Sequence, residues 1–501
     1  MYERAFAMKD KHTLPPGPRG LPFLGNVLQF RRNQLSFLLK LEQTYGRMAT
    51  VYIGRTPIVL LFRPEHIRYV LTENPRNFTS REVAGGLVFG NLLVLSLLAR
   101  SFTNKITQGL HDLVGDGLLT TDGDFHRWHR RLLQPAFSKR RVENYANMIV
   151  QYTRETMEHW QPGVQIDIAH DLQALILRMI MKILVDIDVV KQDSEVGQII
   201  DAVLAQPVGL LEGLLNLQID VPITPYGKRI AAMRKGDAYI YNLIDQRLAE
   251  KRDVGDILSI LLQAQDANDA ITKQQMRDEL ISLFAAGHET TTNTLTWTFY
   301  LLSEHPTVRE KVLAELQTVL AGRDPTVDDL PHLVYFDWVI KESMRLYPSA
   351  WTQGRQAVEA FDLDGYHFPA GTMLMFSQWV LHRLPDIWGD PEVFRPERWD
   401  PVHGQKVPQW AYFPFGGGSR ICMGMSLAQL EIRLALATIL QCYVPCLVPG
   451  HPVVPLPLIT LRVKHGLYMK LEPAPGLPDG GARNVHTDSI IECPYHEQSA
   501  T

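Results

Sequence analysis

The feature that most constrains the fold is one long helical stretch near the middle of the chain. Thr272 and Gln275, three residues apart, have the pattern of a capping box that begins a helix. The next proline is Pro306, and the sequence between keeps a helical pattern for about 33 residues, or roughly 50 Å. An average helix is about a third as long. This helix therefore has to cross a whole domain, and its middle is expected to lie in the core.

The remaining secondary structure is predicted to be mostly helical. Helical patterns cover most of 124–347, with breaks at Pro162-Gly163 and around 222–227. A hairpin is indicated around Gly54-Arg55-Thr56-Pro57, and short strands follow Tyr347. A helix is expected over 425–441 and a terminal hairpin over 459–471. The predicted fold class is mainly α with a minor β part.

Length and composition indicate a globular enzyme. The chain has 501 residues, of which 46% are hydrophobic and 21% charged. These are ordinary proportions for a soluble protein, and the net charge of −4 gives no reason to expect nucleic acid as a partner. We expect an extended, proline-rich segment over 1–26, a single domain over 27–471 and a disordered tail over 472–501.

The cysteines and the N-terminus favour a cytoplasmic protein. The four cysteines lack CxxC spacing, which favours a reducing compartment. The N-terminal sequence shows neither a signal peptide nor a transmembrane anchor. One stretch, 83–99, is free of charge for 17 residues. It has three interpretations: a buried loop and helix, a segment that dips into a membrane or lines a channel, or a short membrane span.

A glycine-rich loop ends in Cys422. Gly416, Gly417 and Gly418 let the backbone approach a flat cofactor closely, and their amides are expected to point at the sulfur and stabilise a thiolate. The helix that begins just after Cys422 favours the thiolate as well. Considered alone, such a cysteine is more often a structural residue beside a turn.

This segment resembles the haem-binding loop of the cytochrome P450 family, whose pattern is Phe-x-x-Gly-x-Arg-x-Cys-x-Gly. Phe415, Gly418, Arg420, Cys422 and Gly424 occupy every fixed position. The resemblance implies the cytochrome P450 fold, with the long helix over a haem b and the cysteine loop beneath it. It also implies that Cys422 is the axial ligand of the haem iron, that Arg420 pairs with a propionate, and that Phe415 and Gly424 contact the cofactor.

Further motifs extend the resemblance from residue 15 to about 471. In the long helix, the run from Ala286 to Thr291 corresponds to the family's acid-threonine pair, which implies that Glu289 and Thr290 deliver protons. Ala286 is expected to contact the haem, and the absent side chain of Gly287 is expected to open space for a ligand. His288 is not expected to bind iron. Taken alone, this run would be a helix contact with surface polar residues.

A second implied group is an ionic network that holds the surroundings of the cysteine loop. It comprises Glu342, Arg345 and Arg398. Glu342 and Arg345 share one helix face at i and i+3, and alone they would be read as a solvated ion pair.

The haem propionates are expected to bind basic residues from three segments. His126 and Arg130 share a helix face, and the resemblance places them, with Arg355, at the propionates, whereas Trp128 is interpreted as packing. Other basic residues form a cluster that is either a solvated face or a docking site for an acidic electron donor: Arg127, Arg131, Lys139, Arg140 and Arg141.

The implied reaction inserts one atom of O2 into a hydrophobic small molecule, a fatty acid or a terpenoid. The candidate pocket residues are Phe284, Ala285, Ala350 and Trp351, with 87–98 nearby and 207–226 as a lid. Electrons are expected from a separate ferredoxin or flavodoxin-type donor with its reductase, and the protein is expected to be a monomer. Two alternatives stay open: a peroxide-driven or rearranging haem-thiolate enzyme, and a haem-binding sensor or carrier without catalytic activity.

Overall fold

The computed structural model describes residues 14–80, 114–189, 225–266 and 271–475. The predicted apolar segment 83–99, nearly all of the predicted lid and almost all of the predicted tail lie outside these residues. The described helices are α1 (Val27–Arg32), α2 (Gln34–Tyr45), α3 (Pro64–Arg68), α6 (Gly123–Leu133), α7 (Lys139–Glu143), α8 (Ala146–Met157), α9 (Ile168–Val185), α12 (Pro225–Glu250), α13 (Ile257–Asp266), α14 (Lys273–Glu304), α15 (Pro306–Leu320), α16 (Val334–Leu346), α17 (Gln378–Leu381), α18 (Pro385–Trp388) and α19 (Met425–Leu440). One short segment, η1 (Tyr69–Glu73), is a π-helix. Short 3₁₀ helices are η3 (Gln134–Phe137), η4 (Val327–His332), η5 (Pro396–Trp399) and η6 (Gly418–Arg420).

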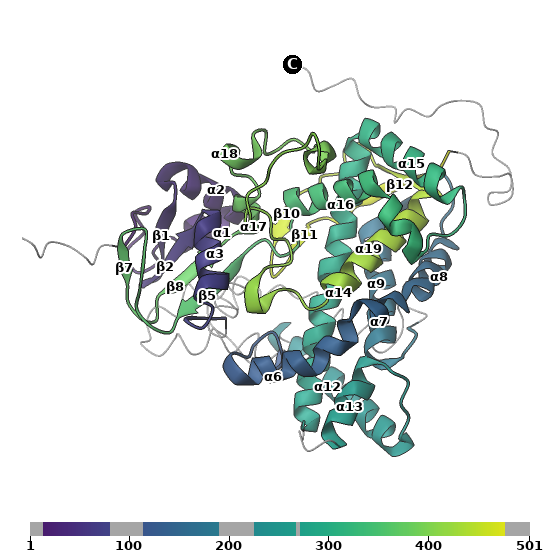
Figure 1. Ribbon diagram of the computed structural model, residues 1–501, viewed down its shortest axis with the longest axis horizontal. Helices are drawn as coiled ribbons and strands as arrows, with labels where there is room; N and C mark the ends of the chain where they lie inside the picture. Colours follow the sequence, from purple (N-terminus) through teal and green to yellow (C-terminus); the bar gives the residue numbers. More distant parts are fainter. Residues whose placement is uncertain (1–13, 81–113, 190–224, 267–270, 476–501) are drawn as a thin grey trace, which may run out of the picture.

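The strands form small sheets, of which only the largest lies wholly at one side of the helices (Figure 1). They are β1 (Met48–Ile53), β2 (Thr56–Leu61), β3 (Phe78–Thr79), β4 (Gln165–Asp167), β5 (Gln353–Ala357), β6 (Phe361–Leu363), β7 (Tyr366–Phe368), β8 (Met373–Phe376), β9 (Tyr443–Leu447), β10 (Pro455–Pro457), β11 (Leu461–Val463) and β12 (Tyr468–Pro473). The largest sheet has the order β1-β2-β8-β5-β3. The fold class expected from the sequence, mainly α with a minor β part, is confirmed.

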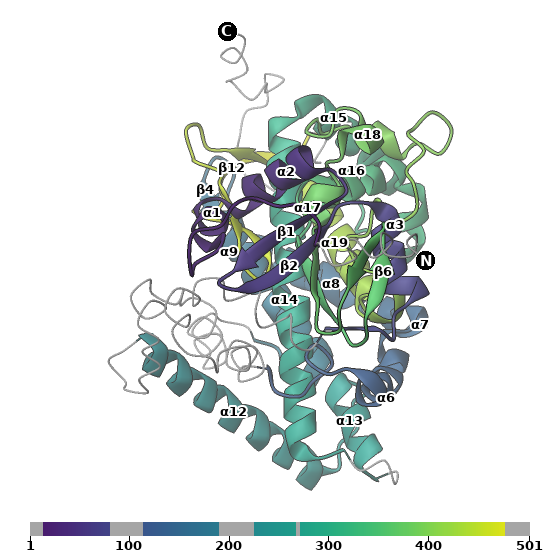
Figure 2. The same ribbon diagram turned by 90° about the vertical axis from the view of Figure 1, so that its left-hand side faces the viewer.

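The long helix α14 is the axis of the helical part. Thr272 and Gln275 form the predicted capping box, and the helix runs unbroken for 32 residues. In Figures 1 and 2 it extends from the region of α12 and α13 to that of α16, past α9 and α19. Its C-terminal half is largely buried, as expected for a helix that crosses the domain. The expectation that its middle lies in the core was wrong, because between residues 283 and 290 only His288 is buried and Ala286 is exposed.

Two hydrophobic cores flank this axis. One is built from helices, including α8, α9, α14 and α19. The other lies between the largest sheet and α2, and contains aromatic residues such as Trp297 and Phe376. Trp297 of α14 stacks on Tyr347 at 4.0 Å between ring centroids, and Tyr347 packs against both cores. The two parts are therefore joined through α14.

The predicted terminal hairpin over 459–471 was wrong. β11 pairs with β10, whereas β12 pairs with β9 and β4 in a separate sheet. The two strands that were expected to pair with one another therefore belong to different sheets. The hairpin that does exist, β10–β11, spans 455–463.

No helix among the described residues is both long and apolar enough to cross a membrane.

Candidate active site

The cysteine loop is held tightly by packing at its glycines. The amide of Cys422 donates to the carbonyl of Phe415 at 2.9 Å and closes the loop. Gly418 has φ +65°, and a Cβ there would lie 1.9 Å from the carbonyl oxygen of Leu71. A Cβ on Gly417 would lie 2.0 Å from the ring of Trp410. Glycine is therefore required here by close packing of the loop itself.

The sulfur of Cys422 is accessible yet surrounded by protein. The residue is exposed, but burial by its surroundings raises the pKa of the thiol, while the amide of Gly424 and the charge of Arg130 oppose that rise. These features are those of a side chain that faces an internal recess. The amide that reaches the sulfur belongs to Gly424, which follows the cysteine, rather than to the three glycines before it as expected.

Four basic side chains from distant segments gather beside this cysteine. Burial and the charge of Arg420 lower the pKa of Arg355 to about 10, although Asp122 opposes this. Burial, with the charges of Arg420 and Arg130, lowers the pKa of His126 to about 3. Arg130 also donates to the carbonyl of Ile421 at 2.9 Å, so α6 is fixed against the cysteine loop.

This cluster fits an anionic cofactor. Arg355 is 7% exposed and His126 is 5% exposed, and both are held near other cations at an energetic cost. Arg420 donates to the carboxylate of Asp122. The buried positive charges exceed this one acid, and two propionates would compensate them. The residues present therefore suit a haem, which Cys422 would bind through its sulfur.

The exposed position in the middle of α14 is Ala286. Ala286 is exposed and Thr290 is half-buried, within a helix that is otherwise largely buried. The hydroxyl of Thr290 donates to the carbonyl of Ala286 at 2.7 Å. The prediction that Gly287 opens space for a ligand was wrong, because a Cβ there would lie 2.8 Å from Cδ1 of Ile180 in α9. The glycine instead allows α9 to pack closely.

His288 points toward α9. Its Nε2 lies 3.1 Å from the carbonyl oxygen of Gln173, and its ring stacks on Phe284 at 5.4 Å. This orientation agrees with the expectation that His288 does not bind iron. Phe284, a predicted pocket residue, packs against the helical core.

Glu289 does not hydrogen-bond to Thr290. Its carboxylate accepts hydrogen bonds from the hydroxyl of Thr460 and from Nε of Arg462. Burial alone would raise the pKa of Glu289, but the hydrogen bond and charge of Arg462, with Thr460, hold it below the ordinary value. Sequence reasoning missed both partners, because they lie 171 and 173 residues away and the β10–β11 hairpin that carries them has no distinguishing motif.

The other pocket candidates lie near the same hairpin. Trp351 is 3% exposed, and its Nε1 donates to the carbonyl of Leu458 at 2.9 Å. Ala350 is half-buried. Leu458 and Ile459, at the turn of the hairpin, are exposed apolar residues. The hairpin therefore brings apolar side chains to the region of the predicted pocket.

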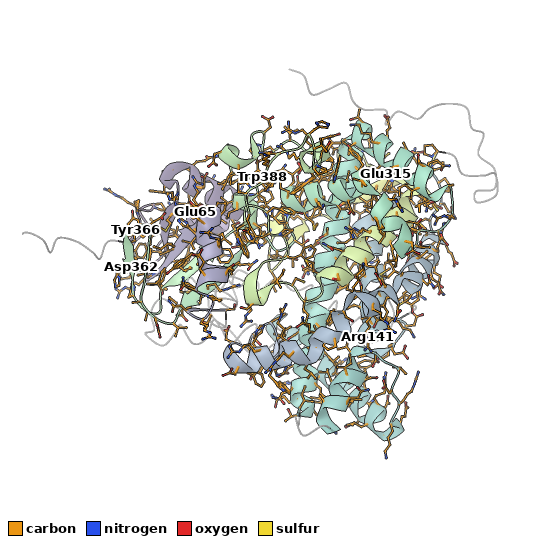
Figure 3. The ribbon with its side chains drawn as sticks, viewed as in Figure 1. Glu65, Arg141, Glu315, Asp362, Tyr366 and Trp388 are labelled. Atoms are coloured by element: carbon orange, nitrogen blue, oxygen red, sulfur yellow. The ribbon has the colours of Figure 1, made fainter. Side chains whose placement is uncertain are left out.

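The predicted ionic network is fully buried. Arg345 binds Glu342 through Nε at 2.9 Å and Nη2 at 2.8 Å, and Arg398 donates to the same carboxylate at 3.1 Å. Trp399 donates to it as well, at 3.0 Å. Arg345 also lies over the ring of Trp388 at 5.1 Å, which Figure 3 shows between the sheet and the helices.

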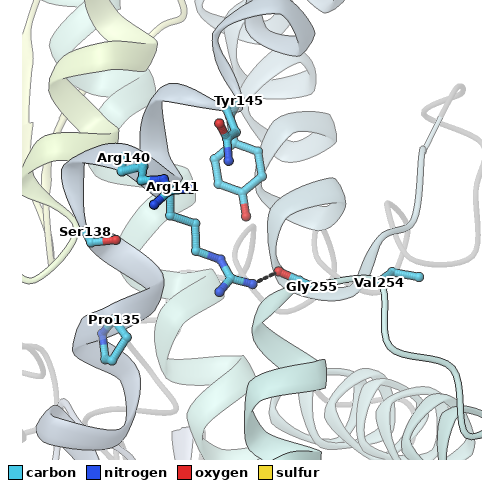
Figure 4. Close-up of a pocket in the computed structure, with 8 residues that line it drawn as sticks. Pro135, Ser138, Arg140, Arg141, Tyr145, Val254 and Gly255 are labelled. Atoms are coloured by element: carbon cyan, nitrogen blue, oxygen red, sulfur yellow. Dashed lines mark hydrogen bonds between the residues drawn. The ribbon is translucent and has the colours of Figure 1, made fainter.

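The basic residues on α6 and α7 divide into paired and unpaired groups. Arg127 pairs with Asp124, and Lys139 with Glu143. Arg141 donates to the carbonyl of Gly255 across an open cavity of about 490 Å³ (Figure 4). Arg131 and Arg140 are exposed, and neither forms an ion pair with any residue that the structure describes.

The chain is similar to known proteins over nearly its whole length. The family model described as Cytochrome P450 matches residues 15–87 and 97–458. Cyclooctat-9-en-7-ol 5-monooxygenase of Streptomyces melanosporofaciens is 33% identical over 88% of this chain and 93% of its own length. Pentalenene oxygenase of Streptomyces avermitilis is 31% identical over 92% of this chain and 98% of its own.

A solved structure has the same fold. Retinoic acid-bound cyanobacterial CYP120A1 superposes with a TM-score of 0.78 and 26% sequence identity, covering 93% of this chain and all of its own.

Proposed function

The chain belongs to the cytochrome P450 family and is a monooxygenase, and we propose that its substrate is a terpenoid. The observation that carries this proposal is the likeness, over nearly the whole chain, to oxygenases named for cyclooctat-9-en-7-ol and pentalenene. The neighbouring structure holds retinoic acid, which is also isoprenoid. These names favour the terpenoid over the fatty acid among the substrates expected from the sequence.

The apolar surroundings of the hairpin turn support a hydrophobic substrate. Leu458 is 38% exposed and Ile459 is 47% exposed, and the indole nitrogen of Trp351 donates to the carbonyl of Leu458 in this turn. We propose that these residues, with Phe284, Ala285 and Ala350, contact the substrate. Apolar lining with few polar groups is typical of sites for small hydrophobic ligands.

We propose haem b as the form of the family's haem-thiolate cofactor. Cys422 would bind the iron, His126, Arg130, Arg355 and Arg420 would hold the propionates, and Phe415, Gly424 and Ala286 would contact the ring. When bound, the haem supplies oxygen activation, which a thiolate ligand promotes. Burial raises the pKa of the Cys422 thiol, and the amide of Gly424 and the charge of Arg130 oppose that rise.

We propose that two residues of α14 deliver protons. Thr290 Oγ1 would pass protons toward the reacting oxygen, and Glu289 would resupply them from solvent. Thr290→Ala is expected to bind haem and substrate but to divert most reducing equivalents to peroxide. Unchanged coupling of electron use to product would count against this role.

We propose a ferredoxin or flavodoxin-type protein with its reductase as the electron source. Its docking charges would be the exposed and unpaired Arg131 and Arg140. Arg141 already binds the carbonyl of Gly255, so it contributes less to docking than the sequence suggested. We further propose that the enzyme acts as a monomer.

The substrate class is tested by a binding screen on the haem-loaded protein. Terpenoid alcohols and hydrocarbons are expected to shift the haem Soret band at micromolar concentration, whereas fatty acids of similar size are not. Turnover of the best ligand with surrogate redox partners should give a product heavier by one oxygen. Preferential binding and hydroxylation of fatty acids would overturn the terpenoid proposal.

The same turnover assay separates the two alternatives. A peroxide-driven or rearranging enzyme would form product without an electron donor, and a sensor or carrier would form none. The ligand assignment has its own test: reduced protein with carbon monoxide should show a thiolate-type Soret band that Cys422→Ser abolishes. Retention of that band in the variant would show that another residue binds the iron.

A further inference from the structure

The β10–β11 hairpin lies directly against the part of α14 that carries Glu289 and Thr290. The indole nitrogen of Trp297 donates to the carbonyl of Leu461 at 2.9 Å. The side-chain amide of Asn293 donates to the hydroxyl of Thr460 at 2.9 Å. The amide of Leu461 also donates to the carbonyl of Ser349 at 3.0 Å. The hairpin is thus fixed to α14 one to two turns beyond Glu289.

This attachment brings two donors to one carboxylate oxygen. Thr460 accepts from Asn293 and donates its own proton to Glu289, so the hydroxyl has a defined direction. Arg462 donates from Nε to the same oxygen. The side chain of Glu289 is 13% exposed and that of Arg462 is 28% exposed. Within the described residues, Arg462 forms no other ion pair.

The pairing decides the ionisation of the relay acid. Burial would raise the pKa of Glu289, but Arg462 outweighs burial and lowers it, helped by Thr460 and by His288 on the same helix. Glu289 is therefore ionised across the neutral range, with its carboxylate turned toward the hairpin. In this position it has no proton to donate, while the hydroxyl of Thr290 binds the carbonyl of Ala286.

We propose that Arg462 and Thr460 are positioning residues that hold Glu289 as a carboxylate away from Thr290, and so limit proton delivery in the resting enzyme. The inference rests on the proposed relay role of Glu289. To act, the carboxylate leaves Arg462, takes one proton from water and gives one toward Thr290 Oγ1. The carboxylate is regenerated at each cycle, and the proton balance comes from solvent.

The first test measures the ionisation of Glu289 in the haem-loaded protein without turnover. Infrared difference spectra between pH 6 and pH 8 should show no protonation change of Glu289 in the wild type. Arg462→Gln removes the charge that lowers the pKa, so a carboxylic acid band should appear at pH 6. That band should vanish in Arg462→Gln combined with Glu289→Gln, and Arg462→Lys should restore the wild-type spectrum.

The second test measures oxygen consumption without substrate, with surrogate redox partners. Arg462→Gln is expected to consume oxygen roughly tenfold faster than wild type at pH 6, and less so as pH rises. Arg462→Lys should be near wild type. The matched control is Arg433→Gln, which breaks an ion pair with Asp337 of similar exposure on another part of the fold and should change neither readout.

The outcomes separate this inference from the proposed function. If Glu289→Gln alone leaves the coupling of electrons to product unchanged, the relay itself is wrong. If Glu289→Gln uncouples but Arg462→Gln folds, binds haem and changes neither the infrared band nor the pH profile, Arg462 is structural and the proposal is overturned. Should Arg462→Gln fail to fold, Thr460→Val removes one hydrogen bond with little change of shape and must shift both readouts in the same direction, or the proposal fails.

Discussion

The molecule buries charge in two opposite ways. Around Glu342, every charge has its partner: one carboxylate accepts hydrogen bonds from the buried Arg345 and Arg398 and from the half-buried Trp399. Around Arg355, basic side chains lie near one another, and burial, together with the neighbouring charge of Arg420, lowers the pKa of both Arg355 and His126. The first group is complete within the protein, whereas the second is complete only with an anionic ligand. Burial of charged residues therefore does not by itself distinguish a structural network from a binding site. The balance of charge within each group does.

The largest expected effect comes from removing the acid of the complete network. Glu342→Ala leaves Arg345 and Arg398 buried without their carboxylate, which should cost about 3–5 kcal/mol of unfolding free energy. Urea denaturation of the haem-loaded protein measures the loss, and absorbance measures haem occupancy. The control is Glu65→Ala, which breaks an exposed pair with Arg47 and should cost less than about 1 kcal/mol. Equal stability of the two variants would contradict a stabilising network.

A buried acid that is uncharged at neutral pH extends the comparison between the two groups. Glu431 of α19 is 2% exposed, and burial raises its pKa to about 8, with a hydrogen bond from Thr291 opposing the rise. The folded state binds this proton more tightly than the unfolded state, whose carboxyl titrates near 4.5. Stability should therefore be fully present below pH 4.5 and be lost as pH rises toward 8, by at most about 1.4 kcal/mol per pH unit.

Glu431→Gln removes the ionisation and keeps the shape. The variant should be more stable than wild type by at most about 3 kcal/mol at pH 7 and about equally stable at pH 4.5. Urea denaturation at both pH values measures the difference. A constant difference between the two proteins across this range would show that Glu431 does not titrate in the folded state.

Removing a charge from the cluster around Arg355 should weaken haem binding rather than lower the stability of the fold. Arg355→Met keeps the apolar part of the side chain and relieves repulsion with Arg420, but removes one charge from the proposed propionate site. We expect haem release to an acceptor protein about tenfold faster, equivalent to about 1.4 kcal/mol. Arg383→Met is the matched control, because Arg383 is also buried with a pKa of about 10 but has Glu392 as its partner. It should lose stability and keep its haem; the reverse pattern would break the comparison.

What the sequence predicted follows from how local each signal is. The boundaries of α14 depend on a capping box and on periodicity within one segment, and both were confirmed. The pairing of Glu289 with Arg462 spans 173 residues, and nothing near either residue specifies it. The predicted hairpin over 459–471 was wrong for the same reason. Alternating apolar residues are compatible with pairing to any neighbouring strand, and β12 pairs with β9 and β4.

Gly287 shows a second limit. A glycine in a helix indicates close approach, but not what approaches. Here the neighbour is Ile180 of α9, while the exposed position next to it is Ala286. Whether a ligand or a neighbouring helix approaches Gly287 depends on how α9 packs against α14. That packing cannot be read from the sequence of one segment.

The smallest expected effect concerns exposed charges, which belong to neither buried group. Arg131 and Arg140 are exposed and unpaired among the described residues, whereas Arg141 binds Gly255. Arg131→Glu with Arg140→Glu should slow reduction by a ferredoxin or flavodoxin-type donor a few-fold at low salt. Stopped-flow reduction measures the rate. The effect should fade above physiological ionic strength, where the Debye length is about 8 Å or less.

Arg141→Gln tests the contrast between Arg141, which is hydrogen-bonded to Gly255, and the unpaired Arg131 and Arg140. It removes the hydrogen bond to the carbonyl of Gly255 beside the cavity in Figure 4, so it should change local stability more than the reduction rate.

Peroxide-supported turnover bypasses the donor and should stay within about twofold of wild type in the double glutamate variant, because exposed charges contribute little to stability. If both routes slowed together, Arg131 and Arg140 would be structural. If Arg141→Gln alone slowed reduction, the docking charge would lie at the cavity instead, and the division between paired and unpaired arginines would fail as a guide to the donor site.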